Sequence, residues 1–110
     1  MALKQPVEQT IREMVRRIVA YAHPRQIILF GSHARGGADA DSDVDLLVVV
    51  PGGGSKRRKA VELYHLLTGM GVPKDVIVVT PEEVDRYRDV PGTIIYPALR
   101  EGKVLYGSAA

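Results

Sequence analysis

The sequence contains no cysteine, no tryptophan and no asparagine, and only one phenylalanine. Without cysteine, the chain cannot form a disulfide, a thiolate metal site or a cysteine nucleophile. It also lacks any apolar run near the ~18 residues of a membrane span, and Arg16 and Arg17 interrupt the one N-terminal stretch that a signal peptide would need. The absence of thermolabile asparagine and cysteine is typical of heat-adapted proteins. We therefore expect a soluble, cytoplasmic protein that does not associate with membranes.

The 110 residues are 45% hydrophobic and 25% charged, which is the composition of a folded globular protein. A chain of this length buries roughly two-thirds of its unfolded surface, so we predict a single domain over residues 1–110. The net charge of +2 is small, but residues 36–54 contain four aspartates and no base, and residues 55–74 contain five bases and one acid. Such an acidic segment is either an ordinary polar loop or a cation site beside a surface that binds polyanions.

Apolar spacing and breaker residues predict helices that alternate with strands. The strand predicted at 43–50 is apolar at nearly every position after its acidic start, which implies helices on at least one face of the sheet. We therefore predict an α/β (α+β) fold with a small mixed sheet flanked by helices. The predicted helices cover 7–22, 56 to Gly69, the segment from Pro81 and 94–99; the strands cover 26–30, 43–50 and 75–80, with an edge strand or a core cover at 104–106. The buried side of the helix after Ser55 is expected to consist of Val61, Leu63, Tyr64, Leu66 and Leu67.

Asp43 and Asp45 begin the second predicted strand. Because they are two residues apart, their side chains leave the same face, roughly 6.5–7 Å from one another along the backbone. Two carboxylates directed at one point can hold one or two Mg²⁺ ions, with substrate phosphates completing the coordination. Paired metals about 3.5–4 Å apart can clamp the attacking and leaving oxygens of a phosphoryl displacement. The alternative interpretation is a pair of solvated aspartates at the start of a strand.

Gly31 and Ser32 follow the first predicted strand and precede a short helical turn. Glycine lets the backbone approach a phosphate, and the first N–H groups of a helix bind anions. The Ser32 hydroxyl can contact a triphosphate oxygen, act as an ordinary helix N-cap, or do both. Arg35 is expected to pair either with a phosphate or with one of the nearby aspartates.

The pattern Gly-Ser, then Ala-Arg-Gly, then Ser-Asp-x-Asp-Leu lies within residues 31–48. It resembles the signature of the nucleotidyltransferase superfamily that includes DNA polymerase beta and kanamycin nucleotidyltransferase. The short length is most similar to the minimal nucleotidyltransferase branch, antitoxins often paired with HEPN-domain toxins. The resemblance implies Mg²⁺-dependent transfer of a nucleoside monophosphate, AMP from ATP, to a hydroxyl acceptor. On the antitoxin branch this acceptor is a tyrosine of the HEPN toxin, and the expected partner is such a small helical protein or a second copy of the chain.

The resemblance also implies a third carboxylate on a neighbouring strand, where it binds metal or activates the attacking hydroxyl. The matching position is Asp75, which begins the third predicted strand. The alternative is that Asp75 is merely the exposed residue before burial starts, neutralised by the adjacent Lys74. The resemblance therefore assigns catalysis and metal binding to Asp43, Asp45 and Asp75, and nucleotide binding to Gly31, Ser32 and Arg35.

A basic run, residues 56–59 (Lys-Arg-Arg-Lys), occupies the first turn of a predicted helix, where the helix dipole disfavours cations. It is either a solvated face or a site for an anion: a triphosphate tail, a nucleic acid or an acidic protein. Nucleic acid is not favoured, because the run lacks interleaved aromatic residues. The competing hypothesis for the whole chain is a non-enzymatic antitoxin or binding subunit that neutralises its partner by occupancy. The aspartates argue against it, because a pure binder needs no cluster of like charges.

Overall fold

A computed structural model describes residues 6–39 and 41–107 of the chain. The helices and strands lie where the apolar spacing predicts them, and the C-terminal segment is indeed an edge strand. Most observed bounds lie within one or two residues of the predicted ones, and the third helix ends at Leu66, before the predicted Gly69. In chain order the elements are α1 (Val7–Ala22), β1 (Gln26–Phe30), α2 (Ser32–Arg35), β2 (Val44–Val49), α3 (Lys56–Leu66), β3 (Lys74–Val79), α4 (Pro81–Tyr87), α5 (Ile95–Glu101) and β4 (Lys103–Tyr106). In the part of the chain that the structure describes, no helix is both long and apolar enough to span a bilayer.

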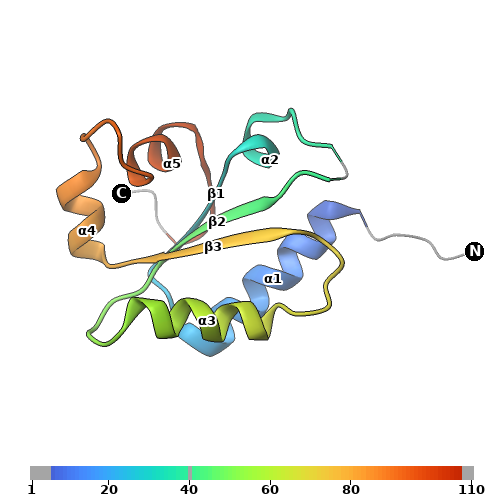
Figure 1. Cartoon of the computed structure of the whole chain (residues 1–110), viewed down its shortest axis with the longest axis horizontal. Helices are drawn as coiled ribbons and strands as arrows, with labels where there is room; N and C mark the ends of the chain where they lie inside the picture. Colours follow the sequence, from blue (N-terminus) through green and yellow to red (C-terminus); the bar gives the residue numbers. More distant parts are fainter. Residues whose placement is uncertain (1–5, 40, 108–110) are drawn as a thin grey trace, which may run out of the picture.

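The strands form one mixed sheet in the order β3-β2-β1-β4, which confirms the predicted fold class. Strand β1 runs antiparallel to both β2 and β4, whereas β2 and β3 are parallel and α3 makes the crossover between them. Helices cover both faces of this sheet: α1 and α3 pack on one face, and α4 and α5 pack on the other (Figure 1). The short α2 follows the end of β1, and its buried Ala34 packs into the cluster of α1 and α3. Strands β3 and β4 are the two edges.

The alternation of side chains along β2 divides its apolar residues between two clusters. Leu46 and Val48 pack into the cluster that includes α1 and α3, while Leu47 and Val49 pack with α4 and α5 on the opposite face. This burial on both faces explains why nearly every position of the strand is apolar. Along α3 the prediction was wrong for Val61, which is 48% exposed, because the helix directs Leu63 toward the core and turns Val61 to solvent.

Candidate active site

The three predicted carboxylates lie on the same face of the sheet, where β2 and β3 begin. Asp45 of β2 and Asp75 of β3 are direct partners in the parallel register, and neighbouring strands lie about 4.8 Å apart. Asp43 immediately precedes β2 and is two residues from Asp45, so the alternation of side chains directs both to one face. That face is the one covered by α4 and α5, since Leu47 projects from it as well. The fold thus places the side chains of Asp43, Asp45 and Asp75 together.

The backbone of Gly31 packs directly against the carboxylate of Asp45. The two meet because Phe30, the last residue of β1, is the antiparallel partner of Asp45. Gly31 has a φ of 75°, and a Cβ at this position would overlap Oδ2 of Asp45 and come within 3.2 Å of its Cγ. Only glycine satisfies both requirements. The glycine and the aspartate of the sequence pattern are therefore two sides of one contact.

Helix α2 begins next to this contact. Its N-cap is Gly31 and Ser32 is its first residue, so the alternative role of Ser32 as an N-cap is wrong. No side chain of the described residues caps this helix start. At the other side of α2, Nε2 of His33 lies 3.1 Å from the carbonyl oxygen of Ser42 and donates a hydrogen bond to it, because a carbonyl can only accept. This bond fastens α2 to the segment that leads into Asp43.

The electrostatics at Asp45 are those of a crowded anionic site. Burial raises the pKa of the Asp45 carboxyl above its ordinary value, and the negative charges of Asp75 and Asp43 raise this pKa further. His33 and Arg35 lie close enough to lower it in part. A bound cation would relieve the repulsion among the three carboxylates.

The donor set suits magnesium in particular. Over residues 6–39 and 41–107, no three or more Asp, Glu, His or Cys side chains form a protein-only metal site. Mg²⁺ does not require one, because it is usually held by one or two carboxylates together with substrate phosphates and water. An open row of carboxylate oxygens fits that mode of binding better than it fits a structural metal site.

Arg35 extends from α2 toward α5. Its Nη1 lies 3.6 Å from Oε2 of Glu101, and both side chains are more than half exposed. The structure therefore pairs Arg35 with Glu101 and not with an aspartate of the site. An exposed ion pair of this kind contributes only about 0–1 kcal/mol, so a phosphate can replace Glu101 at little cost. Nothing in the local sequence pointed to Glu101, which is distant along the chain.

Sequence reasoning assigned Tyr64 only to the buried side of α3, but the structure connects it to the site. Its hydroxyl donates a hydrogen bond to Oδ1 of Asp75 at 2.8 Å and accepts one from the backbone N–H of Val76 at 2.9 Å. Burial raises the pKa of the Tyr64 hydroxyl, and its hydrogen bond to the Asp75 carboxylate adds to that rise. Lys74 lies with its Nζ 5.7 Å from the centre of the Tyr64 ring. The available signal was a phenol on an otherwise aliphatic helix face, because a buried hydroxyl needs a partner.

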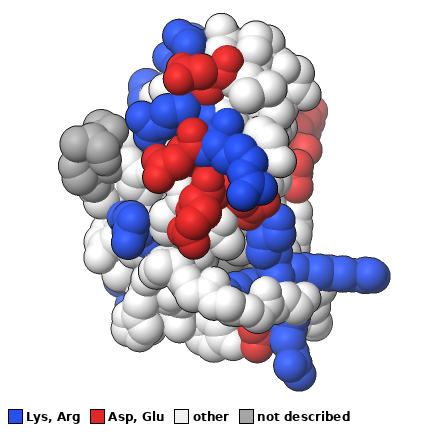
Figure 2. Space-filling model, turned by 90° about the vertical axis from the view of Figure 1, so that its left-hand side faces the viewer, with Lys and Arg blue, Asp and Glu red and all other residues white. Residues whose placement is uncertain are grey.

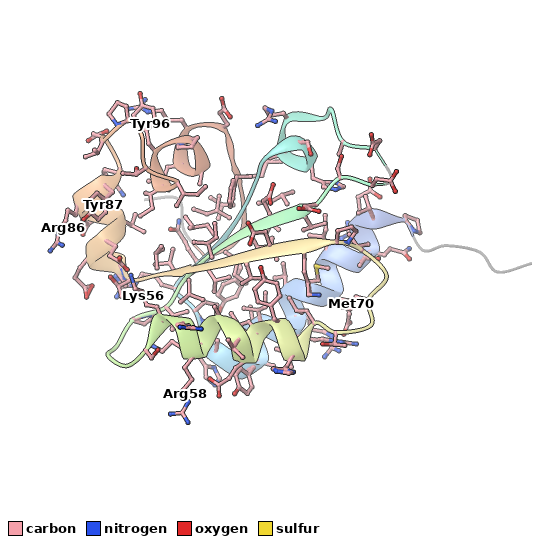
Figure 3. All side chains as sticks on the ribbon, viewed as in Figure 1. Lys56, Arg58, Met70, Arg86, Tyr87 and Tyr96 are labelled. Atoms are coloured by element: carbon pink, nitrogen blue, oxygen red, sulfur yellow. The ribbon has the colours of Figure 1, made fainter. Side chains whose placement is uncertain are left out.

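The basic run lies far from these carboxylates. It follows the C-terminal end of β2, whereas Asp45 is near the N-terminal end of that strand. Lys56 pairs with Glu83 at 2.6 Å, and Lys59 donates to the carbonyl of Gly53 at 2.9 Å. Arg58 points away from the body of the molecule (Figure 3). The position argues against contact between this run and a triphosphate bound beside Gly31.

The surface around the start of α4 carries both signs of charge. Figure 2 shows acidic and basic side chains intermixed on this side of the molecule, with basic side chains projecting at its lower edge. Three ion pairs account for much of the mixing: Lys56–Glu83, Arg88–Asp85 and Arg100–Asp89. This face is therefore not a continuous cationic platform for a polyanion.

A hollow of about 720 Å³ lies between the start of α1 and α2. Asp43, Asp45 and Asp75, all within the described part of the chain, do not line it. Its walls come from the start of α1, from α2 and from the segments before β2 and β3, and include Thr10, His33, Asp39, Ser42 and Met70. The three aspartates therefore lie on the open sheet face and not in this hollow.

A family model described as the nucleotidyltransferase domain matches residues 8–97 of the sequence. The chain belongs to this family. The match includes Gly31, Ser32 and all three aspartates, so the contact between Gly31 and Asp45 lies inside the nucleotidyltransferase domain. No curated protein matches the sequence significantly.

Solved structures share the nucleotidyltransferase fold with this chain. A Sulfolobus solfataricus protein described as a candidate nucleotidyltransferase is 20% identical, with a TM-score of 0.60 over 96% of this chain and 93% of the other. A toxin–antitoxin structure with AMP-PNP is 22% identical, with a TM-score of 0.52 over 92% of this chain and 73% of the other. A variant of the toxin–antitoxin MntA–HpeT is 22% identical, with a TM-score of 0.51 over 94% and 75%. At these identities, the similarity establishes the common fold.

Proposed function

We propose that this chain is a Mg²⁺-dependent nucleotidyltransferase that transfers AMP from ATP to a hydroxyl group, and that it acts as an antitoxin on a tyrosine of a HEPN-type toxin. The observation that carries this proposal is the pairing of Asp45 with Asp75 across two parallel strands, with Asp43 on the same face. Family membership supports nucleotidyl transfer, and the fold shared with toxin–antitoxin structures, one of them with AMP-PNP, supports the nucleotide and the partner.

Each residue of the site has a role in this proposal. Asp43, Asp45 and Asp75 hold Mg²⁺, which when bound neutralises the phosphates and polarises the phosphorus under attack. The backbone of Gly31 and the hydroxyl of Ser32 orient the triphosphate at the start of α2. Arg35, released from its exposed pair with Glu101, contacts a phosphate oxygen.

The transfer forms a bond between the acceptor oxygen and the α-phosphorus and breaks the bond from that phosphorus to the pyrophosphate oxygen. The acceptor hydroxyl loses its proton to the carboxylate of Asp75. Asp75 and Asp43 are both exposed, so an acceptor on the surface of another protein can approach this face directly. We propose that residues 1–110 act as one domain in this reaction and that the toxin supplies the opposite wall of the site.

Label transfer tests this proposal. The chain is incubated with Mg²⁺ and a small helical protein encoded beside it, using ATP labelled at the α- or the γ-phosphate. We expect the α-label, and not the γ-label, to become attached to the partner and to be lost when its acceptor tyrosine is changed to phenylalanine. Asp45→Asn should abolish transfer. Asp41→Asn is the matched control, since Asp41 is an exposed aspartate of the preceding segment and should transfer normally.

Other outcomes contradict the proposal in distinct ways. Transfer of the γ-label would identify a phosphoryl transferase. Neutralisation of the partner with no label transferred, by the wild type and the Asp45→Asn variant alike, would identify a binding antitoxin that works by occupancy. Full transfer by Asp45→Asn would remove the carboxylate site from the mechanism.

A further inference from the structure

The hydroxyl of Tyr64 lies between the carboxylate of Asp75 and the free edge of β3. It makes two hydrogen bonds, to Oδ1 of Asp75 and from the N–H of Val76. A backbone N–H can only donate, so it takes a lone pair of the phenol oxygen and leaves the single hydroxyl proton directed at Asp75. The backbone therefore sets the direction of donation, from Val76 to Tyr64 and from Tyr64 to Asp75. The Tyr64 hydroxyl engages Oδ1 of Asp75 and leaves Oδ2 for another ligand.

Asp75 needs such an anchor because of its position. It is exposed, it lies on an edge strand, and its neighbours toward the middle of the sheet are the like-charged Asp45 and Asp43. Repulsion from these two groups favours rotamers that turn the Asp75 carboxylate away from them. The hydrogen bond from Tyr64 opposes that rotation.

Tyr64 is itself held firmly. It belongs to α3, which packs on the opposite face of the sheet through Leu63 and the capping residue Leu67, both essentially inaccessible to solvent. From that helix the side chain reaches the β3 edge, where Lys74 lies over its ring. The anchor of Asp75 is thus connected to the apolar core.

We propose that Tyr64 is a positioning residue that holds Asp75 in the orientation in which its Oδ2 binds Mg²⁺ and its carboxylate meets the acceptor hydroxyl. This inference rests on the proposed function. Groups that orient metal-binding side chains typically change metal affinity or activity by about 10- to 100-fold when they are removed. The expected effect of losing the Tyr64 hydroxyl lies in that range.

The first test compares two phenylalanine variants by their affinity for Mn²⁺, measured by electron paramagnetic resonance with ATP absent and present. Tyr64→Phe should weaken Mn²⁺ binding about 10- to 100-fold and lower kcat for transfer, with little change in the KM for ATP. Tyr21→Phe is the matched control, because the Tyr21 hydroxyl also donates to a carboxylate, that of Glu62, at 2.9 Å, but away from the site. It should behave as the wild type.

A double-mutant cycle shows whether Tyr64 acts through Asp75. If it does, Tyr64→Phe should have almost no further effect on Mn²⁺ affinity or kcat in the Asp75→Asn background. Additive losses would mean that the hydroxyl supports the fold in general, and would overturn the inference. Wild-type Mn²⁺ affinity and kcat in Tyr64→Phe, with both clearly lowered in Asp75→Asn, would overturn it while leaving the proposed function intact. If Asp45→Asn and Asp75→Asn each retained wild-type Mn²⁺ affinity and kcat, both this inference and the proposed function would be refuted.

A measurement on the unmodified protein guards against a variant that fails to fold. Bound Mn²⁺ should broaden the ring resonances of Tyr64 strongly in NMR spectra and those of Tyr21 much less. Equal, weak effects on both rings would place the metal away from Asp75 and would overturn the inference without any substitution.

Discussion

Asp45→Asn should stabilise the metal-free protein, although Asp45 is essential to the proposed reaction. Asp45 and Asp75 are register partners, so their charges lie about 5 Å apart. Coulomb's law gives a repulsion of about 3 kcal/mol at an effective dielectric constant of 20 and about 1 kcal/mol at that of water. Burial of the ionised Asp45 carboxylate destabilises the folded protein further. We expect the free energy of unfolding to rise by about 1–3 kcal/mol, and Tm by at least about 4 °C.

The pH dependence follows from the raised pKa of Asp45. This carboxyl ionises less readily in the folded than in the unfolded protein, so the wild type loses stability as the pH rises from the ordinary value of 3.8 through the raised folded pKa. Below 3.8 the carboxyl is protonated in both states, and the difference between wild type and Asp45→Asn should vanish. The gain in stability of Asp45→Asn over the wild type should therefore be complete at neutral pH and shrink on acidification.

Urea and thermal unfolding in EDTA, at pH 7.5 and near pH 4, measure these differences. Asp41→Asn, at an exposed position, should stay within about 0.5 kcal/mol of the wild type at both values. Adding Mg²⁺ and ATP should make the wild type more stable than Asp45→Asn, because the wild type gains binding free energy that Asp45→Asn cannot. If Asp45→Asn is no more stable than the wild type at pH 7.5 in EDTA, charge repulsion and burial at Asp45 do not lower the stability of the metal-free protein, and the reasoning fails.

Three further results are expected. Gly31→Ala should destabilise the fold by about 1–3 kcal/mol and abolish transfer, because alanine is strained at this φ and its Cβ would clash with the Asp45 carboxylate. Gly36→Ala is the control, since Gly36 also has a positive φ but faces open space, and this variant should retain transfer. Thermal melts and label-transfer assays compare the two variants. Replacing Arg57 and Arg58 by glutamine should leave ATP binding unchanged, since these side chains lie at the opposite end of β2, and calorimetry showing weaker ATP binding would contradict this placement. ATP should raise Tm in Mg²⁺ and much less in EDTA; equal shifts in a thermal melt would mean that no carboxylate-bound metal is involved.

The fold class could be predicted from the sequence because local signals agreed with one another. Ser55 does cap α3, with its hydroxyl accepting from the N–H of Arg58, and Pro81 occupies the first turn of α4. The apolar run of β2 required cover on two faces, and the structure supplies it. Val61 was misplaced because an apolar residue on a short helix can be turned to solvent at little cost.

The candidate site could be predicted only in part. Asp43 and Asp45 form a local pattern, so the alternation of a strand sufficed to place them on one face. The partnership of Asp45 with Asp75 depends on the parallel crossover through α3, which no local pattern specifies. The contacts of Tyr64 with Asp75 and of Arg35 with Glu101 join residues from different elements, and they appear only once the chain is folded.

The hydrogen bond from Val76 to Tyr64 also affects how this protein behaves toward other chains. An unpaired strand edge offers its N–H groups to any extended segment, which is a common start of aggregation. At β3, the Tyr64 hydroxyl already accepts a hydrogen bond from one of these donors, the N–H of Val76, so an incoming strand cannot pair with that group. The opposite edge, β4, is short and begins with the exposed Lys103, which also disfavours strand addition. Tyr64 thus also helps to protect the β3 edge from pairing with other chains. A chain without this side chain would have to block that edge in another way.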